Sequence, residues 1–160
     1  MTGSRPGSPF HLAELNIGRT VAPIDEPAMA DFVANLDRIN GLGDASPGFV
    51  WRLQDEFGAA TTIRAFDDPR MILNLTVWES IETLREYAYR SDHVAFLRRR
   101  REWFVPLDGP SLVLWWVPSG HRPTIDEARQ RLDRLAADGP TPAAFTLKVT
   151  FPPDDRPDDA

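Results

Sequence analysis

Residues 10–21, FHLAELNIGRTV, decide the fold, because their side chains alternate between two faces as in a half-buried β-strand. One face carries His11 and aliphatic residues. The other face places Glu14 and Asn16 among apolar side chains. Buried polar groups need partners, so this face predicts either a hydrogen-bonded network across neighbouring strands or the polar wall of a ligand pocket.

Working outward, residues 71–78 (MILNLTVW) alternate in the same way and put Asn74, Thr76 and Trp78 on one face. Residues 112–117 (LVLWWV) are continuously apolar, which predicts a central strand buried on both faces. Trp115 and Trp116 must then point to opposite faces.

Helical spacing and capping signals predict the remaining elements. The predicted helices are one from Pro27 to its end at Asn40-Gly41, one at 80–90 capped by Ser80 and one at 92–104. A further helix follows the capping box of Thr124 and Glu127 and stops at Gly139. The remaining strands are one at 49–53 and a possible edge strand at 144–151. This order predicts an α+β fold, a ferredoxin-like split βαβ antiparallel sheet with its helices on one face and an added C-terminal helix.

Such a sheet leaves one face uncovered, here the face that carries Trp and Phe together with Asn, Glu and Thr. That face is too apolar for a monomer surface and a second copy is its simplest cover, so we expect a homodimer. The 160 residues (18.0 kDa) predict a single domain at 10–151, between a disordered N-terminus at 1–9 and an acidic disordered tail at 152–160.

Composition excludes several functions. The chain has no cysteine, so thiolate metal sites, disulfides and cysteine nucleophiles are ruled out. Its formal charge of −6 argues against nucleic acid as a partner. Without a long apolar run or a secretory leader, we expect a cytoplasmic protein with no membrane partner. Phosphate-loop, dinucleotide and nucleophile-elbow motifs are absent from the sequence.

Five segments carry a resemblance to a known family: HLAELNIGR (11–19), PGFVWRL (47–53), NLTVWES (74–80), YRSDHVAFLRRRREWF (89–104) and VPSGHRPTIDEARQRL (117–132). The chain resembles an uncharacterised family, of the type called domain of unknown function 3291, within the dimeric α/β-barrel superfamily. That superfamily also contains antibiotic-biosynthesis and heme-degrading monooxygenases. The resemblance implies a homodimer with a cavity between each sheet and its helices.

The resemblance also implies candidate chemistry. Cofactor-free monooxygenases of the superfamily place Asn, Trp or His beside an anionic aromatic substrate, and this chain offers Asn16, Trp78 and His93. The heme-degrading branch has its ligand histidine one or two turns further along the helix, where this chain has arginines. That departure disfavours heme, although His93 itself could ligate iron.

From these residues we predict a catalytic base, His93, with Asn16 and Arg100 holding developing negative charge. The predicted ligand-binding residues are Glu14, Trp51, Asn74, Trp78, Phe96, Trp116 and His121. Each has a structural alternative: a helix cap for His93, a solvated helix face for the run Arg98–Arg101, a turn hydrogen bond for His121, and core packing for the tryptophans.

The sequence therefore predicts a protein that binds a small apolar or aromatic molecule. If it is an enzyme, it is a cofactor-independent monooxygenase-like, or isomerase- or cyclase-like, enzyme with no metal site and no cofactor. The alternatives are a non-catalytic binding module and a heme-binding protein with His93 as ligand.

Overall fold

A computed structural model describes residues 9–53, 70–90 and 98–153. Within these ranges, side chains are described at all positions except Asp37, Ile39, Asn40, Arg90 and Arg100. The predicted loose ends lie outside the described residues apart from Pro9, Pro152 and Pro153, so the domain limits 10–151 stay a prediction.

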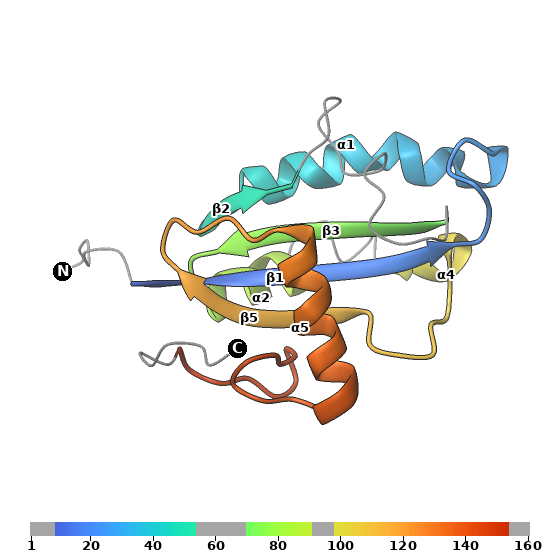
Figure 1. Ribbon diagram of the computed structural model, residues 1–160. Helices are drawn as coiled ribbons and strands as arrows, with labels where there is room; N and C mark the ends of the chain where they lie inside the picture. Colours follow the sequence, from blue (N-terminus) through green and yellow to red (C-terminus); the bar gives the residue numbers. More distant parts are fainter. Residues whose placement is uncertain (1–8, 54–69, 91–97, 154–160) are drawn as a thin grey trace.

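Five strands form one antiparallel sheet: β1 (Phe10–Thr20), β2 (Phe49–Arg52), β3 (Met71–Trp78), β4 (Phe104–Val105) and β5 (Leu112–Pro118). The long strand β1 is central (Figure 1). It pairs with β3 on one side, and β3 pairs with β2; on its other side it pairs first with β5 and then with the two residues of β4. The predicted α+β fold with a ferredoxin-like sheet is thereby confirmed.

The helices lie on both faces of this sheet. They are α1 (Ala30–Asp44), which follows a 3-10 turn at Pro27–Met29, α2 (Ile81–Arg90), α4 (Arg100–Trp103) and α5 (Ile125–Asp138). In Figure 1, α5 crosses in front of the sheet while α2 lies behind it. The side chains of α1, α2 and α4 pack with the face that carries Glu14, and α5 packs on the opposite face.

Both predicted helix caps are confirmed. The Ser80 hydroxyl accepts a hydrogen bond from the Thr83 amide at 3.1 Å, and Thr124 accepts one from the Glu127 amide, also at 3.1 Å. These bonds satisfy amides that the first turns of α2 and α5 would otherwise leave without an intrahelical partner.

Two predicted helix ends are wrong. Helix α1 runs past Gly41 to Asp44, because its last turn packs on α2 through Gly43, which faces the Tyr87 ring. The predicted helix at 92–104 ends at Trp103. Phe104 is instead in β4, where its backbone pairs with Thr20.

Two strand predictions also need correction. Strand β5 is buried on both faces as predicted, but it pairs only with β1 and is not central. Its outer side is bridged by Phe145, which exchanges backbone hydrogen bonds with Leu114 at 2.8 and 2.9 Å. That single bridge takes the place of the edge strand predicted at 144–151.

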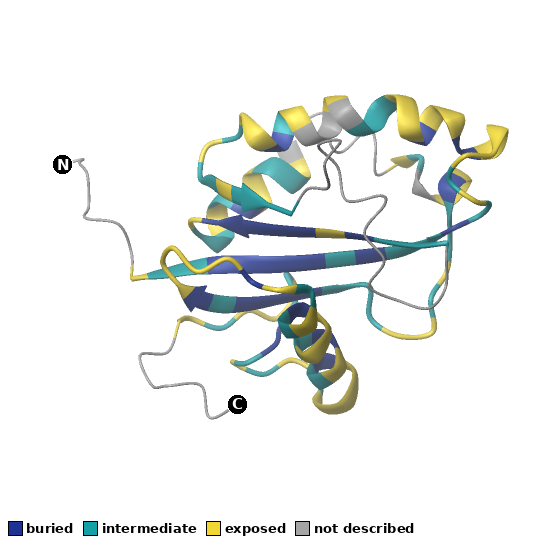
Figure 2. Ribbon diagram, turned by 45° about the horizontal axis from the view of Figure 1, so that its top comes forward, coloured by how far each residue is buried: buried dark blue, intermediate teal, exposed yellow. Residues whose placement is uncertain are grey.

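The face predicted to be uncovered is buried within one chain. It carries Glu14, Thr76 and Trp78, which are all buried, and Leu84 of α2 packs on it. The opposite face of the sheet is buried as well, because α5 covers it with Ala128, Leu132 and Leu135. Figure 2 shows the strands largely buried and the outer side of α5 exposed. The reason given for a homodimer therefore does not hold, and the homodimer stays a prediction.

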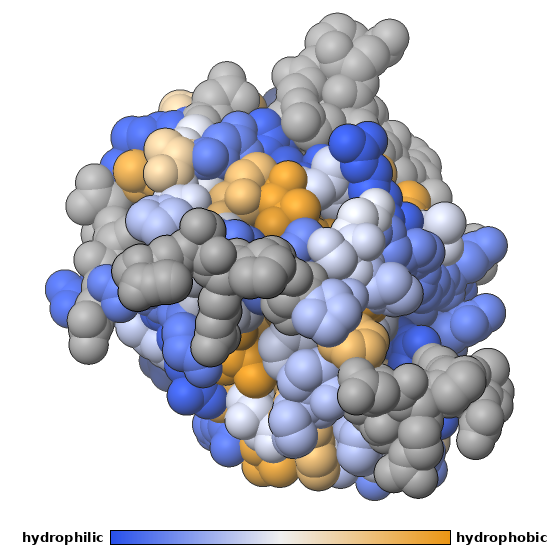
Figure 3. Space-filling view, turned by 90° about the vertical axis from the view of Figure 1, so that its left-hand side faces the viewer, coloured by the Kyte–Doolittle hydropathy of each residue, from blue (hydrophilic) through white to orange (hydrophobic). Residues whose placement is uncertain are grey.

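The exposed apolar residues are scattered. In the part of the chain that the structure describes, the large exposed ones are Val33, Val50, Tyr89 and Val149. Figure 3, which views the molecule from the left of Figure 1, shows apolar side chains in separate patches among polar ones. Scattered exposure of this kind is normal for a monomer surface.

Candidate functional site

The opposite sheet face, beneath α1 and α2, is apolar at its ends and polar in its middle. Register pairs Glu14 with Thr76 and Asn16 with Asn74 across β1 and β3. Leu12 and Trp78 flank these pairs at one end, and Gly18 and Ile72 flank them at the other. The alternation of the two strands therefore assembles four polar side chains in one band.

A chain of hydrogen bonds holds the carboxyl group of Glu14. The indole Nε1–H of Trp78 donates to Thr76 Oγ1 at 3.0 Å, and the Thr76 hydroxyl donates to Glu14 Oε1 at 2.8 Å. All three residues are buried; Glu14 is 8% exposed. The Thr76 hydroxyl thus accepts from the indole and donates its one proton to the carboxyl group.

A cavity of about 20 Å³ lies against this carboxyl group. Its walls come from the sheet, α1 and α2, and the lining residues are Glu14, Gly43, Phe49, Arg52, Asn74, Thr76, Trp78 and Tyr87. The space suits one water-sized group, since about one probe sphere of volume is needed for a water molecule. Asn74 is exposed, so the cavity adjoins the surface on that side.

Burial raises the pKa of Glu14 to about 7, although the hydrogen bond from Thr76 acts in the opposite direction. A carboxyl group with such a pKa is present in both protonation states near neutral pH. That property is what a general base or acid requires, because it must gain and lose a proton in each cycle.

Two further side chains line the cavity, the phenol of Tyr87 and the guanidinium of Arg52. Burial raises the pKa of Tyr87, and the nearby carboxylates of Glu14 and Asp44 raise it further, so its hydroxyl stays protonated. Arg52 forms a bidentate ion pair with Asp44, at 2.7 Å for Nε–Oδ1 and 3.2 Å for Nη2–Oδ2. The Arg52 side chain is 11% exposed.

The cavity therefore holds one side chain that can accept a proton and another that can only donate a hydrogen bond. Glu14 can accept a proton near pH 7, whereas Tyr87 keeps its proton and can only donate a hydrogen bond in that range. A small acidic group placed in the cavity could lose its proton to Glu14. The resulting negative charge would lie beside the Tyr87 hydroxyl and the positive charge of Arg52.

The structure brings together four of the predicted site residues. Glu14, Asn74 and Trp78 line the cavity, and Asn16 lies beside Asn74 in the strand register. Asn16 is half-buried and is not a lining residue.

Three other predicted residues lie elsewhere. Trp51 packs with the α5 face, where the Arg122 guanidinium lies 6.0 Å from its ring centroid. Trp116 packs against Phe145, and its Nε1–H donates to the backbone carbonyl of Phe151 at 2.8 Å. These two tryptophans do not line the cavity, and their positions fit the core-packing alternative; their ligand-binding role stays a prediction.

His121 is likewise a turn residue, as its structural alternative predicted. Its Nε2 lies 2.7 Å from Glu127 Oε1, at the start of α5, and Glu127 Oε2 accepts a hydrogen bond from Trp115 Nε1 at 2.9 Å. The contact ties the turn before α5 to the helix and belongs to the other face of the sheet. His121 therefore does not line the cavity, and its ligand-binding role stays a prediction.

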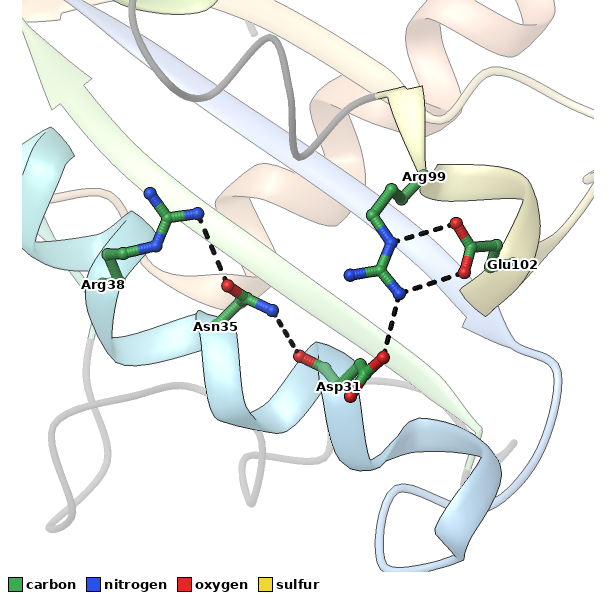
Figure 4. Close-up of polar contacts among 5 residues, drawn as sticks. All are labelled: Asp31, Asn35, Arg38, Arg99 and Glu102. Carbon is green, nitrogen blue, oxygen red and sulfur yellow. Dashed lines mark hydrogen bonds and ion pairs between the residues drawn. The ribbon is translucent and has the colours of Figure 1, made fainter.

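His93 and Phe96 lie outside the described residues, as does the side chain of Arg100, so their predicted roles stay predictions. Within the arginine run, Arg99 is part of a surface network (Figure 4). It contacts Glu102 through two hydrogen bonds of 3.0 Å, and Asp31 of α1 at 3.0 Å. The bonds to Glu102 and then Asp31 raise the pKa of Arg99. For this residue the solvated-face interpretation holds.

Sequence reasoning missed Tyr87, Arg52, Phe49 and Gly43. One signal was available for Tyr87, which follows Ile81 and Leu84 at helical spacing and so belongs to the buried stripe of α2. A phenol on such a stripe needs a polar partner. For Arg52, the residue after Trp51 on a short strand, no local signal existed.

Two further findings concern the described ranges. There, no group of three or more His, Asp or Glu side chains is placed to hold a metal ion. In the same ranges, every helix is too short or too polar to cross a bilayer.

Comparison with solved structures finds proteins of similar fold at low identity. One is a protein of unknown function from Nitrosomonas europaea, with 14% identity over 72% of this chain and 95% of that one, at a TM-score of 0.45. A second is SnoaB, a cofactor-independent oxygenase from Streptomyces nogalater, with 16% identity over 71% and 95% and a TM-score of 0.43.

A third is a monooxygenase from Streptomyces coelicolor in complex with nanaomycin D, with 19% identity over 75% and 95% and a TM-score of 0.37. Likeness at this level says nothing about activity. A search of curated proteins gives no significant match.

Sequence comparison with protein families is decisive for the family. The family described as domain of unknown function DUF3291 matches residues 11–160, nearly the whole chain. The match includes all residues that line the cavity and all of the sheet except Phe10. This protein belongs to the DUF3291 family, as the resemblance implied.

Proposed function

We propose that this protein is a small-molecule enzyme whose reaction begins when Glu14 removes a proton from an apolar or aromatic substrate. The observation that supports it is a buried carboxyl group, at a cavity, whose pKa is about 7. The proposal changes the predicted division of roles, because Glu14 rather than His93 is the base. It needs no metal and no organic cofactor.

The proposed class is a cofactor-independent monooxygenase, as the sequence resemblance implied. An activated methylene between two aromatic rings loses a proton to Glu14, and the carbanion is stabilised by its own rings, by the Tyr87 hydroxyl and by Arg52. Dioxygen is then the oxidant. One of its atoms becomes the carbonyl oxygen and the other leaves as water, so the balance is CH₂ + O₂ → C=O + H₂O. An isomerase or cyclase would share the first step and omit dioxygen.

Cavity size limits how such a substrate binds. About 20 Å³ admits only the reacting group, whereas the pockets that enclose a drug-sized ligand measure roughly 300–1,000 Å³. The remainder of the molecule would lie outside, on the side of exposed Asn74 and half-buried Asn16. This placement gives the two predicted amides a role in orienting the substrate.

Anthrone, whose methylene lies between two aromatic rings, is a suitable probe. We expect the protein to accelerate exchange of its methylene protons with solvent deuterium, and to accelerate oxygen uptake, above the uncatalysed rates. The rate should rise with pH through about 7, as the base ionises. Glu14→Gln should lower it by roughly 10²–10⁴-fold, the usual contribution of a general base.

Glu79→Gln is the matched control, because Glu79 follows β3 directly but is exposed. Unchanged exchange in Glu14→Gln would contradict the role of Glu14. Anthrone binding without exchange would identify a non-catalytic binding module instead. A Soret band that appears with hemin and is lost in His93→Ala would favour the heme alternative.

The homodimer and the cytoplasmic location remain part of this proposal. Sedimentation of the purified protein at several concentrations would test the homodimer.

A further inference from the structure

Trp78 lines the cavity, and its indole nitrogen is the outer end of the hydrogen-bond chain to Glu14. Its ring lies between two aromatic neighbours. The Phe49 ring of β2 meets it edge-on, with centroids 5.5 Å apart and planes at 82°, and the Tyr87 ring of α2 lies 5.2 Å away at 30°. The side chain is 1% exposed, so this packing fixes the direction of its N–H.

We propose that Trp78 is a positioning residue for Glu14: by donating to the Thr76 hydroxyl, it keeps that hydroxyl's proton directed at the Glu14 carboxylate. A threonine hydroxyl has one proton and can also accept. The indole N–H occupies one of the two acceptor positions on the hydroxyl oxygen, and the hydroxyl proton turns away from that donor toward Glu14. The hydroxyl then donates to the carboxylate, and this bond favours the ionised base.

Cooperativity strengthens the same effect. A hydroxyl that accepts a hydrogen bond becomes a better donor, by roughly 10–30% of the bond strength. Trp78 therefore opposes the effect of burial on Glu14 without touching it, acting through Thr76. This inference rests on the proposed function, because only a base that must ionise near neutral pH benefits from such an arrangement.

The other ionisable groups on the described wall act from different directions. Tyr87 comes from α2, and Arg52 comes from β2 with its partner Asp44 at the end of α1. Changing the Trp78 N–H alters the hydrogen-bond chain from the β3 side and leaves these charges in place.

The test measures the pKa of Glu14 directly, by following its side-chain carboxyl carbon by NMR during a pH titration. Thr76→Val should raise the midpoint by about one pH unit, since a hydrogen bond to a charged group is worth roughly that much. Trp78→Phe should raise it by a smaller amount, about 0.3 of a pH unit. Thr76→Ser, which keeps the hydroxyl, should restore the wild-type value.

A double variant separates positioning from packing. If Trp78 acts through Thr76, Trp78→Phe should not move the midpoint further in a Thr76→Val background. Trp116→Phe is the control, because Trp116 is on the same sheet face but donates to a backbone carbonyl. Should Trp78→Phe fail to fold, the isosteric benzothienylalanine analogue at position 78 removes the N–H and keeps the ring volume.

Equal shifts for Trp78→Phe in both backgrounds, or no shift in either Trp78 variant, would overturn the inference. The anthrone assay separates this failure from failure of the proposed function. Activity that depends on Glu14 but has the same pH profile in the Trp78 variants contradicts the inference alone. A pKa shift as expected, in a protein that exchanges no anthrone protons, supports the positioning role and contradicts the proposed function.

Discussion

Replacing Glu14 by glutamine should stabilise the protein at alkaline pH and leave its stability nearly unchanged in acid. In the unfolded chain the carboxyl group titrates near its ordinary pKa of 4.5, and in the folded protein burial raises the pKa to about 7. Between these values the folded state binds more protons than the unfolded state. Wild-type stability therefore falls as pH rises from about 4.5 to 7 and is constant, with respect to this group, above that range.

The size of the effect follows from the two pKa values. They differ by about 2.5 (7 minus 4.5), and each pKa unit corresponds to roughly 1.36 kcal/mol, so Glu14 costs the folded protein about 3 kcal/mol at pH 8. Glutamine keeps an oxygen that can accept the Thr76 hydrogen bond, and it carries no charge. In a chain of this length, the change should raise the melting temperature by roughly 6–12 °C at pH 8.

Urea unfolding, followed by tryptophan fluorescence at half-unit steps between pH 4 and 8, measures this difference. The quantity to compare is the free energy of unfolding of Glu14→Gln minus that of wild type, because other groups titrate equally in both. We expect it to grow with pH up to about 7, while the same difference for Glu79→Gln stays flat. A difference that is independent of pH, or a variant less stable than wild type at pH 8, would refute the reasoning.

Three further predictions concern packing. Leu132→Ala should lower the free energy of unfolding by about 2–4 kcal/mol, measured by urea, because this α5 residue fills the core over the sheet. Gly48→Ala should lower the melting temperature, since Gly48 has φ of 82° and an added Cβ would clash with the Thr83 side chain. Gly43→Ala should raise stability by about 0.5–1 kcal/mol through helix propensity, because its Cβ would meet Tyr87 at an ordinary 3.6 Å, yet narrow the cavity and slow anthrone exchange.

Much of the sheet could be predicted from local pattern, because the side-chain period of a strand is a property of neighbouring residues. The alternation in β1 placed Glu14 and Asn16 on one face of that strand, and the alternation in β3 placed Asn74 and Trp78 on one face of that strand. Only tertiary pairing decides that these two faces are the same face of one sheet, and the structure confirms that they are.

The limits of prediction have physical causes too. An amphipathic pattern shows that α5 must cover something apolar, but the pattern does not say which face of the sheet, and this ambiguity produced the argument for a dimer. A doubly buried apolar run is the same in a central strand and in β5, whose edge is bridged by Phe145. Arg52 and Tyr87 reach Glu14 only through the packing of β2 and α2.

The pairing of Glu14 with Thr76 ties the chemistry of the site to the alignment of two strands far apart in the sequence. A slip of one residue between β1 and β3 would turn every side chain of the slipped strand to the other side of the sheet. If β1 is the strand that slips, the Glu14 carboxyl group would lie in the apolar core under α5, without its hydroxyl donor. Misaligned molecules would thus lack both a proper core and a working base, so correct folding and acquisition of the base are a single event.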